Sequence, residues 1–180
     1  ITLQNNMLRR ITPGFVSDLP SLTKIILNRN FIEELVYDNF GQLDNLEFLD
    51  ISFNHLTSIQ SGTFINLVNL NTLFLQSNYL QELDSDMFIG LKNLNSLHLK
   101  NIKLRVIREK TFKHLSNLNY LKLDENHISL IEPLSFVEVN KLTHLDLSTN
   151  QLVEITVNMF KGLVSLINLD LQSNMISLIA

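Results

Sequence analysis

The sequence predicts an α/β-type solenoid, an arc with a parallel β-sheet on its concave face and mostly irregular, short 3-10 or helical arms on its convex face. Three regularities predict this fold, and each repeats every 24 residues. They are a series of asparagines, a frame of leucines around each asparagine, and a series of phenylalanines in the other half of each unit. A fixed period of this length is typical of repeat proteins, in which neighbouring units share one hydrophobic interior.

The asparagine series needs a physical reason, because asparagine is a poor strand former. After each predicted strand the chain turns inward, and an unpaired buried backbone group costs about 1–3 kcal/mol. An amide side chain donates and accepts at once, so it can satisfy such groups between successive turns. After Asn6, which begins the series, we interpret its members as a structural ladder rather than a catalytic or ligand series: Asn30, Asn54, Asn78, Asn126, Asn150 and Asn174.

The leucine frame reads Leu-x-x-Leu-x-Leu-x-x-Asn-x-Leu. One copy consists of Leu142, Leu145, Leu147, Asn150 and Leu152. Side chains alternate along a strand, so residues 145 and 147 point into the interior while their neighbours face outward. Successive units therefore predict short parallel strands spaced by about 4.8 Å.

The phenylalanine series has the same period, and Val16 occupies the equivalent place before its first member. Aromatic rings at this interval predict a spine that fills the wider, outer side of the coils, and we prefer this structural role to a ligand pocket. The spine consists of Phe40, Phe64, Phe88, Phe112, Phe136 and Phe160.

Taken together, these motifs resemble the leucine-rich repeat family, and specifically its 24-residue "typical" class, over the whole chain. Similar proteins include the ectodomains of Toll-like receptors, hormone receptors and adhesion proteins. The resemblance implies a curved solenoid that binds other macromolecules, usually outside the cell.

One position breaks the asparagine series, because Ile102 stands where the period requires asparagine. One interpretation is a degenerate repeat in which Asn101 compensates for the missing amide. The other is a local change of curvature near a binding site.

We expect a single domain over residues 1–180, of about eight repeats. Both ends stop inside a repeat without the polar cap that a solenoid needs, which predicts an internal fragment of a longer protein. The net charge of −4 and the lack of a basic stripe argue against a nucleic-acid partner. No apolar run reaches the roughly 20 residues that cross a membrane. The chain has no cysteine and no Asn-x-Ser/Thr sequon, both of which favour an intracellular compartment.

Ligand recognition is expected on the concave sheet, where the outward positions are free of framework constraints. Phe48 and Phe74 lie on adjacent predicted strands, and exposed aromatics of this kind anchor protein interfaces. A mixed charged block follows in the next repeats. The predicted ligand-binding residues are Phe48, Phe74, Tyr79, His98, Lys100, Tyr120, Lys122, Asp124, His144 and Asp146.

Other interpretations of these residues stay open. The strip is equally a solvated sheet on which Lys122, Asp124 and Asp146 offset one another, since exposed ion pairs contribute little. Its histidines allow pH-dependent binding, but their spacing does not match a metal site. The acidic arm at residues 81–88 and the basic arm at 104–115 are either a soluble outer surface or a second surface for contacts such as dimerisation.

No catalytic or cofactor-binding motif occurs in the sequence, and a shallow open sheet lacks the dry, preorganised cleft that catalysis needs. We therefore predict a non-enzymatic module without cofactor or metal that binds a protein or another macromolecule. The first hypothesis is an extracellular or cell-surface recognition protein with an immune, hormone-receptor or adhesion role. The alternative is an intracellular scaffold that holds an assembly together, and a more distant one is an ancillary domain of an enzyme.

Overall fold

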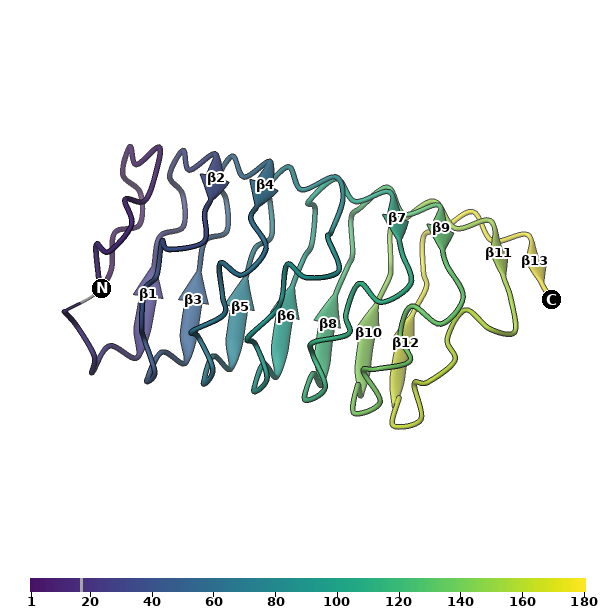
Figure 1. Ribbon diagram of the computed structural model, residues 1–180. Coiled ribbons are helices and arrows are strands. Elements are labelled where there is room, and N and C mark those ends of the chain that lie inside the picture. The colour runs from purple at the N-terminus through teal and green to yellow at the C-terminus, as the bar shows by residue number, and fades with distance from the viewer. Residues whose placement is uncertain (17) are drawn as a thin grey trace.

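The computed structural model of the protein describes residues 1–16 and 18–180. The chain winds as one stack of coils, with its N-terminus at one end and its C-terminus at the other (Figure 1). The longer strands stand side by side in one row, and the short outer strands form a second row along the opposite side of the coils. The predicted solenoid is confirmed.

The main sheet is parallel and has seven strands in the order β1-β3-β5-β6-β8-β10-β12. Its register is set by the leucine frame: Leu49 of β3 pairs with Leu73 of β5, which pairs with Leu97 of β6. At the N-terminal edge, Thr2 adds an isolated parallel bridge to Ile26. The strands are β1 (Lys24–Ile26), β3 (Phe48–Asp50), β5 (Thr72–Phe74), β6 (Ser96–His98), β8 (Tyr120–Lys122), β10 (His144–Asp146) and β12 (Asn168–Asp170).

The outer arms contain only short paired strands, joined by turns and irregular segments. The irregular arms are as predicted, but the short helical segments are not found in the described part of the chain. Nor does that part contain a helix long and apolar enough to cross a membrane. The three pairs are β2 (Glu34–Leu35) with β4 (Ser58–Ile59), β7 (Val106–Ile107) with β9 (Leu130–Ile131), and β11 (Glu154–Ile155) with β13 (Leu178–Ile179).

A single hydrophobic interior runs through the stack, built from frame leucines on the sheet side and phenylalanines on the outer side. Phe112 has neighbours on both faces: its ring centroid lies 6.4 Å from that of Phe88 and 5.8 Å from that of Phe136. Phe40 and Phe64 stack at 6.2 Å in the same way. In these stacks each ring fills the space above the one before it, which is why the residue recurs at a fixed interval.

The ladder asparagines connect each coil to the preceding one. In Asn150, Oδ1 accepts the backbone N–H of Ile128 at 2.9 Å. Its Nδ2 donates to the carbonyl of Leu123 in the preceding coil at 2.9 Å and to that of Leu147 in its own coil at 3.1 Å. Asn30, Asn54, Asn78, Asn126 and Asn174 repeat this pattern.

Each turn into the ladder has a residue with positive φ immediately before the asparagine position. None of these residues is glycine, although the left-handed conformation costs other residues roughly 1–2 kcal/mol. The hydrogen bonds of the ladder hold the chain in this otherwise unfavourable turn. The residues are Asn5, Arg29, Phe53, Ser77, Asn101, Glu125, Thr149 and Ser173.

The coil with Ile102 gains an extra hydrogen bond from the next coil rather than a replacement amide. Ile102 is fully buried, and Asn101 does not replace the amide, because its Oδ1 accepts instead from Lys103 Nζ at 2.8 Å. In the following coil, Asn126 Oδ1 accepts two backbone N–H groups, of Ile102 at 3.0 Å and Leu104 at 3.1 Å. Lys103 has a positive φ of 70°, an addition to the usual turn residue of each coil.

A second asparagine series, which the sequence analysis did not identify, lies in the segments that lead into the strands. Asn69 Nδ2 donates to the carbonyl of Asp44, 25 residues earlier, at 2.7 Å. These amides are exposed and join the coils at the outer edge, whereas the ladder joins them in the interior. The series has the same 24-residue period, which is its signal in the sequence. Its members are Asn45, Asn69, Asn93 and Asn117.

Close approach of two coils explains one glycine. Gly90 has a φ of +98°, and a Cβ at this position would lie 2.4 Å from Ile65 Cα and 2.5 Å from the Phe64 carbonyl oxygen. We expect Gly90→Ala to lower the free energy of unfolding by about 3 kcal/mol, because left-handed strain and overpacking against backbone add together. Urea denaturation followed by circular dichroism measures the change.

Gly62→Ala is the matched control. Gly62 also has a positive φ, of +80°, but its added Cβ would meet only the exposed ring of Tyr37 at 3.1 Å. That ring can swing away, so the expected loss is the conformational strain alone, about 1 kcal/mol. Equal losses in the two variants would show that the contact between coils adds nothing.

Candidate ligand-binding face

The outward positions of the main sheet form the candidate site. In β3, for example, Leu49 is fully buried while Phe48 and Asp50 are partly exposed on the other side of the strand. The same alternation recurs along the sheet. Because the strands pair without a shift in register, the outward side chains form two continuous rows across the concave face.

The aromatic end of this face is a contact cluster. The ring centroids of Phe48 and Phe74 lie 5.3 Å apart, and those of Phe74 and His98 lie 4.2 Å apart. At the edge, Lys24 Nζ sits over the Phe48 ring, 4.4 Å from its centroid. The structure thus brings three predicted site residues together and adds Lys24, which the prediction did not include.

Tyr79 belongs to a different aromatic row, formed by the turns that follow the strands. Its ring centroid lies 5.9 Å from that of His55, which in turn lies 5.3 Å from that of Phe31. Phe31 and Tyr79 are both exposed. The spacing of 24 residues from Phe31 to His55 and from His55 to Tyr79 is the sequence signal of this row.

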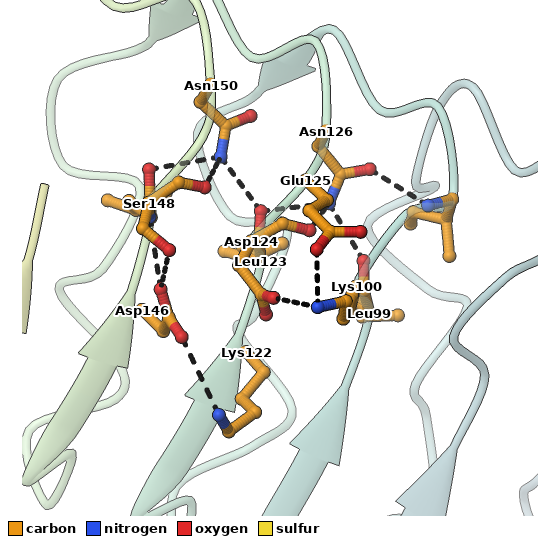
Figure 2. A network of polar contacts seen from close by, with 12 residues as sticks. Leu99, Lys100, Lys122, Leu123, Asp124, Glu125, Asn126, Asp146, Ser148 and Asn150 are labelled. Atoms are coloured by element: carbon orange, nitrogen blue, oxygen red, sulfur yellow. Dashed lines mark hydrogen bonds and ion pairs between the residues drawn. The ribbon is translucent and has the colours of Figure 1, made fainter. Parts of the chain in front are cut away.

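Residues of the charged block form ion pairs with one another (Figure 2). Lys100 Nζ lies 2.9 Å from Asp124 Oδ2 and 2.7 Å from Glu125 Oε1. Hydrogen bonds to Glu125 and Asp124 raise the pKa of the Lys100 ammonium group. Lys122 Nζ faces Asp146 Oδ2 at 3.6 Å. This arrangement matches the interpretation in which the charges offset one another. The ion pairs also hold each charged side chain in a defined position.

Asp124 differs from the prediction in its exposure. We expected this position of the frame to point out from the concave sheet, but only 7% of Asp124 is exposed, and Ser52 and Ser148 at equivalent positions are also buried. The chain bends inward directly after the strand, so this residue is covered by its neighbours. Asp124 Oδ2 is instead paired with Lys100, which is more exposed.

His98 is the partly buried member of the aromatic cluster. Burial lowers the pKa of its imidazole, and the nearby Lys122 ammonium lowers it further. Its Nε2 lies 2.9 Å from Ser96 Oγ on the same strand. The neutral ring is therefore favoured, which suits an aromatic contact with Phe74.

At the other end of the face, a hollow of about 310 Å³ opens over three neighbouring strands. Tyr120 and His144 stack on one side of it, with ring centroids 4.5 Å apart and an interplanar angle of 14°. Asn168 and Asp170 also line it and were not among the predicted site residues. The full lining is Tyr120, Leu121, Lys122, His144, Leu145, Asp146, Asn168 and Asp170.

The acidic and basic outer arms pair with each other. Arg108 Nη2 lies 3.5 Å from Glu82 Oε1, and Lys113 Nζ lies 2.8 Å from Asp86 Oδ1. Hydrogen bonds from Lys113 and then His114 lower the pKa of the Asp86 carboxyl. A cavity of about 480 Å³ lies beside these arms, where residues 82–83 form no strand and the outer sheet is interrupted.

Over residues 1–16 and 18–180, no three His, Cys, Asp or Glu side chains are grouped so as to hold a metal ion. What the concave face offers is recognition chemistry: aromatic surface, fixed charges and one hollow, all on a regular sheet.

Comparison with known proteins agrees with this geometry. The family described as leucine rich repeat matches residues 1–56, 44–101 and 92–152. Mouse podocan is 40% identical over 55 residues, which is 29% of this chain and 9% of podocan.

Two solved structures share the fold. A complex of TLR13 with the single-stranded RNA ssRNA13 has a TM-score of 0.90 and 33% sequence identity, over 95% of this chain and 24% of that chain. The Drosophila complex of Toll with Spatzle has a TM-score of 0.79 and 24% identity, over 98% of this chain and 28% of that chain. The chain thus spans about a quarter of each of these proteins.

The RNA complex bears on the expected partners. The expectation that nucleic acid is excluded is not supported, because a protein similar over nearly the whole chain is bound to RNA in that structure. The expectation of a macromolecular ligand agrees with both complexes. With its period, its parallel sheet and the family match over residues 1–152, the chain belongs to the leucine-rich repeat family.

Proposed function

We propose that the chain is a non-enzymatic recognition module of an extracellular or cell-surface protein, and that it binds a protein ligand on its concave sheet. The observation that carries the proposal is the contact cluster of Phe48, Phe74 and His98 on the outward side of the strands. Aromatic anchors surrounded by polar residues are typical of the centre of protein interfaces. Because the sheet is already formed, the entropy cost of ordering the binding site on association is small.

A protein ligand is favoured over RNA by the charges of the same face. Its outward rows carry Asp50, Asp146 and Asp170. Lys122 is paired with Asp146, and Lys100 with two carboxylates. A phosphate backbone is recognised by unpaired cations, so this face is poorly matched to it.

The extracellular setting is supported by the likeness to Toll and TLR13, over nearly the whole chain in each case. The alternative setting is an intracellular scaffold, for which the lack of cysteine and of sequons is the argument.

The test is a binding experiment with a matched pair of variants. The immobilised chain is incubated in parallel with conditioned medium, a cell extract and labelled single-stranded RNA, and retained proteins are identified by mass spectrometry. We expect a protein from the medium to bind the wild type and to bind Phe48→Ser/Phe74→Ser at least about tenfold more weakly. The control is Val157→Ser/Val164→Ser, which replaces two exposed apolar residues of an outer arm in the same way.

If the variant of the concave face has a native circular dichroism spectrum and binds as tightly as the wild type, the assignment of the binding site is wrong. Retention only from the cell extract would favour the scaffold, and preferential retention of RNA would favour a nucleic-acid ligand.

A further inference from the structure

The hollow at the C-terminal end of the concave face has two rows of side chains over strands β8, β10 and β12. The parallel register aligns Tyr120, His144 and Asn168 in one row, and Lys122, Asp146 and Asp170 in the other. Together they line a volume of about 310 Å³. No strand residue of the framework fills this space, because the intervening leucines point into the interior.

One wall of the hollow is aromatic. The Tyr120 and His144 rings are nearly parallel and stacked on each other, so each ring has one face that this stack leaves free, and 44% of Tyr120 is exposed. A ring face attracts a cation through its quadrupole, and a planar guanidinium group stacks on it better than a compact ammonium group does.

The opposite wall has an excess of negative charge. Asp146 Oδ1 accepts hydrogen bonds from Ser148 N and Oγ, while Oδ2 faces Lys122 at 3.6 Å. Asp170 Oδ1 accepts from Gln172 N at 3.0 Å, and within the described residues Asp170 forms no ion pair. Two carboxylates and one ammonium group line the hollow. The hollow therefore has one excess negative charge, which favours a cationic ligand group.

We propose that this hollow receives one arginine side chain of the protein ligand, with its guanidinium group stacked on a free face of the Tyr120–His144 pair and hydrogen-bonded to Asp170. The inference rests on the proposed function and names the chemistry of its ligand: a basic segment with an arginine at the contact. Arginine suits the site because its planar fork bonds a carboxylate with two parallel N–H groups while its face stays free to stack. Lysine lacks both properties.

The test uses small probes, so that it does not depend on the unidentified ligand. Acetyl-arginine-amide is titrated into the ¹⁵N-labelled chain up to about 50 mM and followed by NMR, since a single side chain binds weakly. We expect saturable shifts in the amides of residues 121–123, 145–147 and 169–171. Acetyl-lysine-amide is expected to bind several-fold more weakly, and the uncharged acetyl-citrulline-amide not to bind.

Two variants are predicted to act in opposite directions. Asp170→Asn removes the free carboxylate and weakens binding of the arginine probe by about fivefold or more. Lys122→Gln removes the competing cation and strengthens binding by several-fold, a result that general loss of structure cannot produce. The control is Asp38→Asn, which removes an exposed carboxylate of an outer arm and leaves binding unchanged.

The inference is overturned by any of three outcomes: no saturable shifts, equal shifts with the citrulline probe, or no effect of Asp170→Asn. Each is separable from failure of the proposed function. If the Phe48→Ser/Phe74→Ser variant loses the protein ligand but the arginine probe does not bind, the concave face remains the binding site and only the assignment of the hollow is wrong.

Discussion

Replacing Asn126 by alanine is expected to be among the most destabilising single changes in the protein. Its Oδ1 accepts the N–H groups of both Ile102 and Leu104, which are fully buried. An unsatisfied buried group costs about 1–3 kcal/mol, so Asn126→Ala should lower the free energy of unfolding by about 4 kcal/mol. Chemical denaturation, followed by circular dichroism, measures this loss.

Asn78→Ala separates the special role of Asn126 from the general role of the ladder. Asn78 is as deeply buried and donates to two carbonyls, but its Oδ1 accepts only one backbone N–H, that of Leu56. Its replacement should cost about 2 kcal/mol, roughly half as much. If both variants lose the same stability, the second bond of Asn126, from Ile102 N–H, adds nothing to the stability of the interrupted coil.

Phe112→Ala is expected to have an effect of similar size, for a different reason. The Phe112 side chain is fully buried between two stacked rings, so its removal leaves a cavity that the coils cannot close without losing their spacing. Core substitutions of this kind cost about 3–5 kcal/mol. Denaturation by urea gives the value for the variant.

The comparison for Phe112 is Phe160, which stacks on one ring only and is partly exposed. Phe160→Ala should cost about half as much, since less of its surface leaves water on folding. A loss as large as that of Phe112→Ala would contradict the view that stacking on both faces stabilises the spine.

Much of the fold could be predicted because a repeat fixes register. Once Leu49, Leu73 and Leu97 are read as equivalent, a shift of one strand by a single residue would turn its leucine out of the interior. Their pairing on consecutive strands follows from that cost. The short helices expected in the outer arms had no such constraint, and the described arms contain turns instead.

The candidate site was less predictable, because it depends on where individual side chains turn. Phe48 and Phe74 were expected to be neighbours and are in contact, whereas Tyr79 packs on His55 in another row. The position of Asp124 in the frame did not show that the inward bend after the strand would bury it. Asp170 matters because it forms no ion pair with the described residues, which a frame position cannot show.

The same limit applies to the interrupted ladder. The sequence located the break at Ile102 and offered compensation by the adjacent Asn101 as one of two interpretations. The structure instead pairs Asn101 with Lys103 and adds a bond from Ile102 N–H to Asn126, which is 24 residues away in sequence and lies in the next coil. In a solenoid, the nearest partner in space is usually one period distant, so proximity in sequence is a poor guide to the bonds around an altered position.

Site-specific photo-cross-linking tests the central claim most directly, namely that the ligand lies on the concave sheet. A benzoylphenylalanine is placed either at Thr72, in the middle of the sheet, or at Val157, an outer-arm residue that is 82% exposed. Each variant is irradiated with the protein retained from conditioned medium. A cross-link from position 72 and none from position 157 is the predicted result, and a cross-link from position 157 alone would contradict it.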